Sequence, residues 1–236
     1  MKAVLLAGGF GTRLQEYTKN SPKCLVEINE RPLLDIWLEK LHRIGVNKFL
    51  INTHYLAEKV ENFISEHRFS NKIEIFHEET ILGTAGTLNA NQDFIDEDTF
   101  IIHADNYCED DLFGFVEAHK NRPMHCLGSL LTFITDDPRN CGIVKTDSEK
   151  VLINFYEKVL EDRGNIASGA LFLITEDWKK EFGHLFSSAF DISRDLVPYM
   201  YNKLLCYLTK ETYIDIGTPD NLQLAKRKAK IKSLIK

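Results

Sequence analysis

The chain has 236 residues and a formal net charge of −6 at pH 7, which argues against nucleic acid as its main partner and allows one α/β domain with a substantial core. Its five cysteines are scattered without C-x-x-C spacing, so they favour a reducing compartment and exclude a disulfide framework or a cysteine-based metal site. Because the sequence has no leader-like segment and no apolar run of about 18 residues, we expect a cytoplasmic protein without a membrane partner.

The first predicted strand ends in a glycine-rich stretch. An apolar run at residues 3–7 predicts a buried central strand, and it leads directly into Gly8-Gly9-Phe10-Gly11-Thr12-Arg13-Leu14. In α/β sheets, ligands bind beyond the carboxyl ends of the strands. Glycines allow backbone N–H groups to approach an anion, and Arg13 and Lys23 add positive charge. The stretch therefore predicts a phosphate site, with a ligand-free turn as the alternative.

Two common phosphate-binding fingerprints do not fit this stretch. A P-loop requires Gly-Lys-Ser/Thr, whereas Gly11 is followed by Thr12 and Arg13. A dinucleotide fingerprint that starts at Gly9 would need its third glycine where Leu14 stands. Cys24 is either a thiol whose pKa is lowered by the neighbouring Lys23 or, as is more common, a buried apolar residue.

Helices and strands are expected to alternate through the first half of the chain. Pro32 is expected to be the first residue of the first long helix, and Gly45 is expected to cap it. Strand–helix–strand order predicts a largely parallel sheet with right-handed crossovers. The expected elements are helix 32–44, strand 48–53, helix 57–67, strand 72–77, helix 85–92 and strand 99–103.

Asp105 directly follows the strand predicted at residues 99–103. A carboxylate at that edge of the sheet, facing a triphosphate, is suited to hold Mg²⁺ together with phosphate oxygens. Alternatively, Asp105 caps a helix expected at residues 109–121 or forms a turn with Asn106. The residues alone leave these alternatives open.

The second half of the chain has short apolar runs separated by turn signals. These runs predict a mixed or antiparallel extension that forms the floor of an acceptor pocket. Glu157-Lys158 at the end of one strand is by default a surface ion pair, and residues 226–232 form a basic, solvated helix end. Thr218 and Pro219 are expected to cap and begin the last helix. The expected elements are strands 126–133, 142–145, 152–157 and 169–173, helix 191–201 and strand 204–208.

Several motifs together resemble one family. They are Leu6-Ala7-Gly8-Gly9-Phe10-Gly11-Thr12-Arg13-Leu14 with Pro22-Lys23, Leu82-Gly83-Thr84-Ala85-Gly86, Asp105, Glu157-Lys158 and Asp215-Ile216-Gly217-Thr218-Pro219. In this order they resemble the sugar-1-phosphate nucleotidyltransferases over residues 1 to about 225. The resemblance implies an Mg²⁺-dependent enzyme that converts an NTP and a sugar 1-phosphate into an NDP-sugar and pyrophosphate.

The resemblance also implies a role for each matching residue. Arg13, Lys23 and Asp105 would be catalytic, and Asp105 and Asp215 would hold the metal. The nucleotide would be bound by Leu6, Ala7, Gly8, Gly9, Gly11, Thr12, Gly83, Thr84 and Gly86. The sugar and its phosphate would be bound by Gly142, Glu157, Lys158, Ser168 and Gly169, where Gly142 and Gly169 leave room for the ring.

The implied fold is a Rossmann-like, mainly parallel mixed sheet flanked by helices, with a small antiparallel extension at the sugar site. We expect one domain with a nucleotide-binding half (1–125), a sugar-phosphate-binding half (126–218) and a C-terminal helix (219–236), able to self-associate as small members of the family do. The form Leu-Gly-Thr-Ala-Gly resembles guanylyltransferases of mannose or heptose 1-phosphates, which favours GTP.

Three letters depart from the family pattern, and other functions stay open. Ala104, Cys141 and Ser168 replace residues common in relatives. The extra methyl of Ala104 could tighten the pocket near the nucleotide, and Ser168 leaves the identity of the sugar open. UTP or CTP could replace GTP as the donor. A non-catalytic nucleotide-sugar-binding regulatory subunit is disfavoured because a binder has no use for two metal carboxylates. A nicotinamide-dependent oxidoreductase is disfavoured by Leu14.

Overall fold

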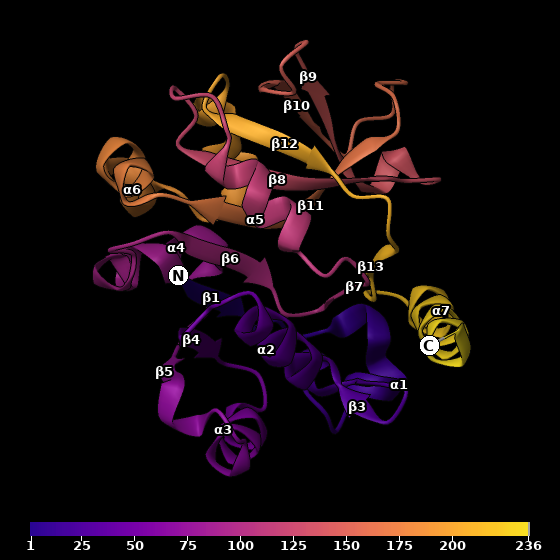
Figure 1. Ribbon diagram of the computed structural model, residues 1–236. Helices are drawn as coiled ribbons and strands as arrows, with labels where there is room; N and C mark the ends of the chain where they lie inside the picture. Colours follow the sequence, from indigo (N-terminus) through magenta and orange to yellow (C-terminus); the bar gives the residue numbers. More distant parts are fainter. Residues whose placement is uncertain (236) are drawn as a thin grey trace. The chain divides into compact units, whose positions relative to one another are not determined.

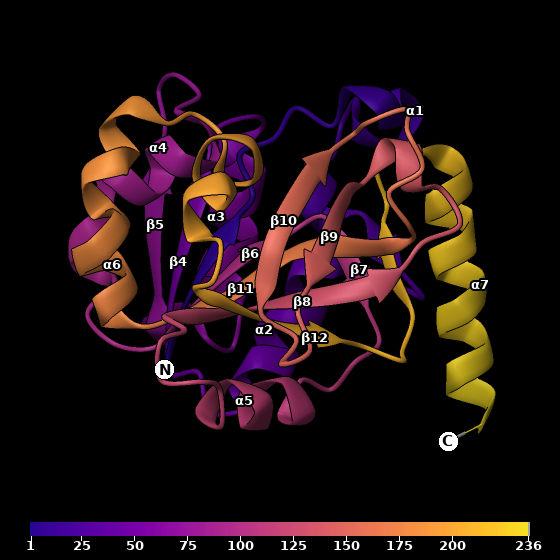
Figure 2. The ribbon, with the colours of Figure 1, turned by 90° about the horizontal axis from the view of Figure 1, so that it is seen from above.

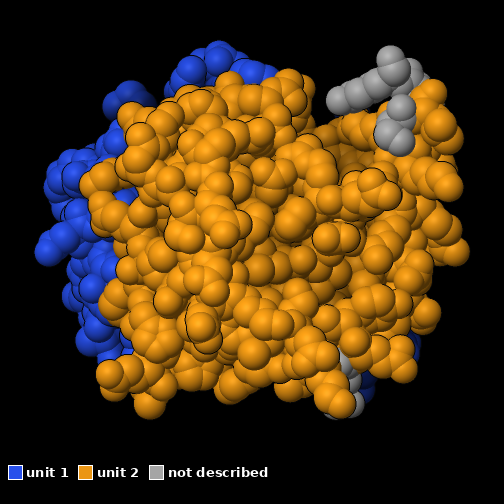
Figure 3. All heavy atoms as spheres, turned by 90° about the horizontal axis from the view of Figure 1, so that it is seen from below, with its two compact units in different colours: residues 1–2, 82–102, 112–210 blue, residues 3–81, 103–111, 211–236 orange. Residues whose placement is uncertain are grey.

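The computed structural model describes residues 1–235 and divides into two compact units (Figure 3). Unit 1 comprises Met1–Lys2, Leu82–Ile102 and Leu112–Lys210, and unit 2 comprises Ala3–Ile81, His103–Asp111 and Glu211–Lys236. Each unit is therefore built from segments that lie far apart in the sequence. None of the helices in the described part of the chain combines the length and apolar character that a membrane span requires.

The sheet of unit 2 is made by neighbouring strands in the order β1 (Lys2–Leu6), β4 (Lys48–Thr53) and β5 (Ile73–His77). β4 and β5 pair in parallel, as the strand–helix–strand pattern predicts. Residues 3–5 of β1 are fully buried, which explains the continuous apolar run. The connecting helix α3 (Ala57–Glu66) packs against β4 and β5 (Figure 1).

Helix α2 (Leu33–Arg43) buries one apolar face in unit 2. Trp37 on that face is 1% exposed, and its indole N–H donates to the carbonyl of Asn106 at 2.7 Å. The helix ends before Gly45, which has φ +94° as a helix-ending glycine should. The expectation that Pro32 is the first helical residue is wrong, because its extended backbone belongs to a short hairpin of β2 (Glu27–Ile28) and β3 (Arg31–Pro32).

A second small sheet in unit 2 joins two distant parts of the chain. β7 (Asn106–Cys108) pairs antiparallel with β13 (Tyr213–Asp215), which places Asp215 opposite Asn106. The last helix, α7 (Pro219–Ile235), follows directly, and the hydroxyl of Thr218 accepts from the N–H of Asn221 at 3.3 Å, which confirms the expected cap. The remaining elements of unit 2 are η1 (Thr12–Leu14), α1 (Gln15–Thr18), η2 (Lys23–Leu25) and η3 (Ser70–Lys72).

Unit 1 contains the antiparallel extension that the sequence predicts. Its strands lie in the order β10–β9–β11–β6, with β8 antiparallel to β11 and β12 parallel to β8 (Figure 2). The mixed α/β fold class is confirmed. The strands are β6 (Thr99–His103), β8 (Gly128–Ile134), β9 (Gly142–Thr146), β10 (Leu152–Glu157), β11 (Ile166–Ile174) and β12 (Leu204–Leu208).

The helices of unit 1 differ most from expectation. α5 (Phe113–Lys120) starts four residues later than predicted, because Leu112 adopts φ +67° and interrupts the helical backbone. The helix expected at residues 191–201 consists of two short turns, η7 (Ile192–Leu196) and η8 (Val197–Met200), since Pro198 lacks an N–H. α6 (Glu176–Phe182), capped by Thr175, was not predicted. The other elements are α4 (Gly83–Ala90), η4 (Gln92–Phe94), η5 (Pro138–Asn140) and η6 (Gly183–Ser188).

Candidate functional site

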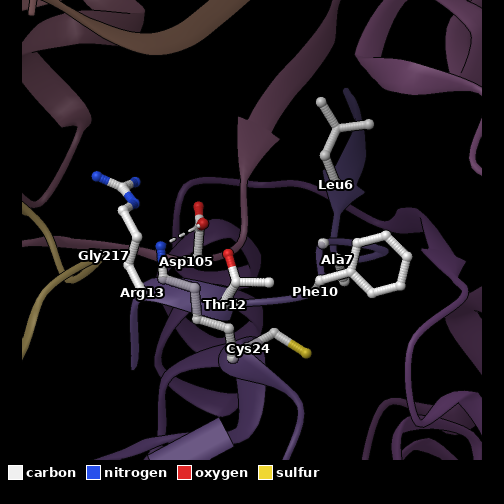
Figure 4. A pocket seen from close by; sticks show the side chains of 11 residues that line it. Leu6, Ala7, Phe10, Thr12, Arg13, Cys24, Asp105 and Gly217 are labelled. Atoms are coloured by element: carbon white, nitrogen blue, oxygen red, sulfur yellow. Dashed lines mark hydrogen bonds and ion pairs between the residues drawn. The ribbon is translucent and has the colours of Figure 1, made fainter. Parts of the chain in front are cut away.

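The glycine stretch after β1 lines a cavity of about 280 Å³ in unit 2. Figure 4 shows the side chains of Arg13, Thr12 and Asp105 around this space, with Phe10 on another side. All of its lining residues belong to unit 2, and they come from the end of β1, the glycine loop with η1, η2, the β6–β7 connection and the segment after β13. The lining residues are Leu6, Ala7, Gly9, Phe10, Gly11, Thr12, Arg13, Lys23, Cys24, Asp105 and Gly217.

Two glycines of the loop have different local demands. Gly11 has φ +63°, and a Cβ at this position would lie 2.9 Å from Cγ2 of Thr18. Its carbonyl accepts from the Thr18 hydroxyl at 2.8 Å and from the N–H of Leu14 at 2.9 Å. A Cβ on Gly9 would meet no atom within 4 Å. Gly11 is therefore required by the backbone, whereas Gly9 leaves open space in the cavity.

Gly11→Ala is expected to destabilise the protein by about 1–2 kcal/mol, because a residue with a Cβ is strained in the left-handed region. Gly9→Ala is the matched control and should change the unfolding free energy by less than about 0.5 kcal/mol, as is usual for a surface substitution. Urea unfolding monitored by circular dichroism measures both values. Equal unfolding free energies for the two variants would contradict the assigned role of Gly11.

Lys23 lies between two carboxylates at one wall of the cavity. Its Nζ donates to Asp105 Oδ2 at 2.6 Å and to Asp215 Oδ1 at 3.1 Å. Asp215 Oδ2 also pairs with the guanidinium of Arg13 at 3.4 Å. The side chain of Lys23 is 9% exposed and that of Arg13 is 67% exposed. The structure thus brings together the four charged residues that the sequence assigned to catalysis and metal binding.

The pKa shifts of this cluster follow from its charges. Burial alone would lower the pKa of Lys23, but the carboxylates of Asp105 and Asp215 outweigh it and hold that pKa above its ordinary value. Burial alone would raise the pKa of Asp105, but the charges of Lys23 and His103 outweigh it and bring that pKa below its usual range. The cluster therefore favours an ammonium between carboxylates.

The backbone fixes the direction of both carboxylates. Asp105 follows Ala104, whose N–H donates to the carbonyl of Leu6 at 3.0 Å, so it lies beside the end of β1. Asp215 Oδ1 accepts from the N–H of Gly217 at 2.8 Å. The alternative that Asp105 caps the next helix is wrong, because the residue that precedes α5 is Leu112 and no side chain caps it.

Cys24 is a buried residue and not a reactive thiol. It is 1% exposed, and burial raises its pKa to about 12. The alternative of a lowered pKa beside Lys23 is therefore wrong.

The predicted nucleobase residues lie at the start of α4 in unit 1. The Thr84 hydroxyl donates to Asp191 Oδ2 at 3.3 Å and accepts from the N–H of Ile192 at 2.8 Å. Gly83 has φ +76°, and a Cβ there would lie 2.3 Å from the carbonyl oxygen of Phe190. A Cβ on Gly86 would lie 2.9 Å from that of Leu82. The close contact with residues 190–192 was not predicted, because no local pattern reports a contact over more than 100 residues.

The predicted sugar-phosphate residues gather on β9, β10 and β11 of unit 1. Gly142 pairs with Glu157 across β9 and β10, and Lys158 Nζ lies 3.5 Å from Glu157 Oε1. The space beside Gly142 is already filled, since a Cβ there would lie 2.4 Å from Phe155 Cζ and 2.7 Å from Glu157 Oε2. Gly142 is thus needed for the packing of these side chains.

Ser168 and Gly169 belong to an irregular part of β11. The register with β8 shifts between Ser168 and Leu171, and Ala170 adopts φ +48°. The hydroxyl of Ser168 accepts from the N–H of Ala170 at 3.1 Å, so it supports the bulge. The predicted site residues therefore form two groups, one in each unit.

Two carboxylates, and not a full set of protein ligands, are available for a metal. Among residues 1–235 no group of three or more His, Cys, Asp or Glu side chains is arranged to hold a metal ion. The ammonium of Lys23 contacts both Asp105 and Asp215. Magnesium commonly uses one or two carboxylates and completes its shell with phosphate oxygens and water. The donor set therefore fits a magnesium ion that arrives with a triphosphate.

Comparison with known proteins supports the resemblance found in the motifs. The family model described as nucleotidyl transferase matches residues 2–231. The D-glycero-alpha-D-manno-heptose 1-phosphate guanylyltransferase of Campylobacter jejuni is 28% identical, over 94% of this chain and 96% of that protein. The mannose-1-phosphate guanylyltransferase catalytic subunit beta of Dictyostelium discoideum is 27% identical, over 93% of this chain but only 62% of its own length.

Solved structures share the fold. HddC from Yersinia pseudotuberculosis, crystallised with GMP-PN, has a TM-score of 0.77 at 24% identity, with 96% of this chain and 98% of that chain covered. A UDP-glucose pyrophosphorylase in complex with UDP-glucose has a TM-score of 0.82 at 18% identity, with 98% of both chains covered. At these identities the likeness establishes the fold alone.

Proposed function

Because the chain belongs to the nucleotidyl transferase family, we propose that it transfers a nucleotidyl group from an NTP to a sugar 1-phosphate, giving an NDP-sugar and pyrophosphate. The observation that carries the proposal is the cluster of Arg13, Lys23, Asp105 and Asp215 beside the cavity of the glycine loop. The proposed donor is GTP, which is supported by the names of the Campylobacter and Dictyostelium relatives. The proposed acceptor is a mannose or heptose 1-phosphate.

The proposed reaction needs no nucleophilic side chain. An oxygen of the sugar phosphate, already an anion at pH 7, attacks the α-phosphorus in line. The new oxygen–phosphorus bond forms as the bond to the β-phosphate oxygen breaks, and the electron pair leaves with pyrophosphate. The protein's task is to position two anions and neutralise their charge. Arg13 would bind the departing pyrophosphate, and Lys23 would contact the α-phosphate.

The glycine loop would hold the phosphates of the nucleotide. Gly8, Gly9, Gly11 and Thr12 would present backbone N–H groups, and the open space beside Gly9 supports close approach of an anion. Asp105 and Asp215 would hold Mg²⁺. When bound, the ion would offset the negative charge of the phosphate oxygens.

The residues of unit 1 would recognise the other parts of the substrates. Gly83, Thr84 and Gly86 would line the nucleobase site, with Thr84 already fixed by two hydrogen bonds. Glu157 would bind sugar hydroxyls, and the exposed Lys158 would bind the sugar phosphate. Gly142, Ser168 and Gly169 would shape that site through the packing of Glu157 and the bulge of β11.

Pyrophosphate release tests the proposal. The purified protein is incubated with Mg²⁺, each of the common NTPs and a panel of sugar 1-phosphates, and pyrophosphate is measured by a coupled assay. We expect the highest kcat/KM with GTP and a mannose or heptose 1-phosphate, and no release when the sugar phosphate is omitted. Higher kcat/KM with another NTP would reassign the donor. No release with any pair would overturn the enzyme proposal and favour a nucleotide-sugar-binding regulatory subunit.

A further inference from the structure

Asn52 is a buried polar side chain near the carboxyl end of strand β4. It is 5% exposed, and its Oδ1 accepts from the backbone N–H of Ala7 at 2.7 Å. Ala7 is the residue that joins β1 to the glycine loop. The Nδ2 of Asn52 donates to Oε1 of Glu78 at 2.9 Å, and Glu78 follows β5 and is 3% exposed. One amide thus ties together the carboxyl ends of three neighbouring strands.

Glu78 determines which way the amide of Asn52 points. The carboxylate oxygens of Glu78 accept hydrogen bonds, so the NH₂ group of Asn52 must face Glu78. The carbonyl oxygen of that amide then faces Ala7, where an N–H needs an acceptor. With the opposite orientation, an NH₂ group would face the N–H of Ala7 and an oxygen would face a carboxylate. Glu78 therefore enforces the acceptor at the entry of the loop.

The loop rests directly on this amide. A Cβ on Gly8 would lie 2.9 Å from Nδ2 of Asn52. The connection that follows β4 supports the loop as well, because Tyr55 Oη donates to the carbonyl of Thr18 at 3.1 Å. The Thr18 hydroxyl in turn donates to the carbonyl of Gly11. The glycine loop is thus fixed both from the end of β4, through Asn52, and from the connection that follows β4, through Tyr55.

We propose that Asn52, oriented by Glu78, is a positioning residue that holds the glycine loop in its anion-binding conformation and thereby sets the affinity for the triphosphate. The part about the triphosphate rests on the function proposed above. Asn52 acts through the backbone of Ala7 and Gly8 and not on the reacting atoms. Its contribution should therefore appear in nucleotide affinity, while the KM for the sugar 1-phosphate stays unchanged.

The donor–acceptor order of the chain Glu78–Asn52–Ala7 permits a rescue experiment. In Asn52→Asp, a second carboxylate faces Glu78 at hydrogen-bond distance, and the two repel each other. In the double variant Asn52→Asp with Glu78→Gln, the amide of residue 78 can donate to the carboxylate of residue 52. The other oxygen of that carboxylate can still accept from the N–H of Ala7. Asn91→Asp is the matched control, since the side-chain amide of Asn91 donates to a backbone carbonyl, that of Thr87 at 2.8 Å, and not to a carboxylate.

Two measurements distinguish the proposed role of Asn52 in the loop from the proposed function of the protein. Hydrogen exchange of the Ala7 amide reports directly on its hydrogen bond to Asn52, which we call the clamp on the loop. Calorimetry with a non-hydrolysable GTP analogue reports the affinity for the triphosphate. For Asn52→Asp we expect exchange and Kd each to rise about tenfold or more, as for a lost buried hydrogen bond. The double variant should return to within about threefold of wild type in both measurements. The control Asn91→Asp should have the wild-type exchange rate and the wild-type Kd.

The outcomes decide the proposal. Wild-type exchange and affinity in Asn52→Asp would overturn it, as would a double variant that is no better than the single one. A rise in the KM for the sugar 1-phosphate equal to the loss of nucleotide affinity would show general destabilisation and also overturn it. If wild type bound no triphosphate while Ala7 exchange followed the expected pattern, the proposed function would fall and the clamp on the loop would stand.

Discussion

Lys23→Met should lower kcat by about 100- to 1000-fold, the range observed when one donor to a developing charge is removed. Methionine keeps the length and apolar stem of the side chain but removes the ammonium that contacts Asp105 and Asp215. Steady-state pyrophosphate release with GTP and the preferred sugar 1-phosphate measures the effect. Lys19→Met is the matched control, because Lys19 is exposed and lies four residues before Lys23 in the sequence. Equal rates for the two variants would refute the role of Lys23.

The same substitution should also change how stability depends on pH. Burial alone would raise the pKa of Asp105, but the charge of Lys23 helps to outweigh burial and to hold that pKa below its usual range in the folded state. A depressed carboxyl pKa stabilises the fold above the unfolded pKa of about 3.9, and this contribution is lost as the pH falls further. Urea unfolding of Lys23→Met should therefore show a weaker loss of stability below pH 4 than wild type. An unchanged slope would mean that Lys23 does not control Asp105.

Asp105→Asn and Asp215→Asn should each reduce turnover by at least about 100-fold while the fold is kept. Asparagine has nearly the same shape as aspartate, but it lacks the charge that a magnesium ion requires. Manganese binding measured by electron paramagnetic resonance, with the GTP analogue present, should weaken in both variants. Asp220→Asn is a suitable control, since Asp220 is exposed in the first turn of α7. Wild-type turnover in either variant would show that the proposed metal ligands are wrong.

The strands were predictable where a run of apolar residues is bounded by turn signals. β4, β6, β10 and β12 have the boundaries expected from sequence or nearly so. Local patterns failed where backbone conformation decides the element. Leu112 with a positive φ delays α5, and Pro198 divides the turns that replace a predicted helix. Neither the positive φ of Leu112 nor the missing N–H of Pro198 changes the spacing of apolar residues, so the hydrophobic pattern could not reveal them.

The candidate site was only partly accessible to reasoning from local sequence. The glycine stretch, Arg13 and Lys23 are close in the chain, so a phosphate-binding site can be predicted from the local sequence. Asp215 was assigned only through the resemblance to a family, because its approach to Lys23 depends on the pairing of β7 with β13. Asn52 was missed because an asparagine at a strand end usually indicates a turn, and its purpose depends on Glu78 and Ala7.

The pairing of β7 with β13 also has a consequence for the order of events during protein synthesis. The contact between Lys23 and Asp215 spans 192 positions, and that between Arg13 and Asp215 spans 202. A chain still attached to the ribosome and shorter than 215 residues contains the glycine loop and Lys23 but lacks one of the two carboxylates. The charge cluster is therefore completed only after residue 215 has been synthesised, and until then Lys23 can pair only with Asp105 among these two acids.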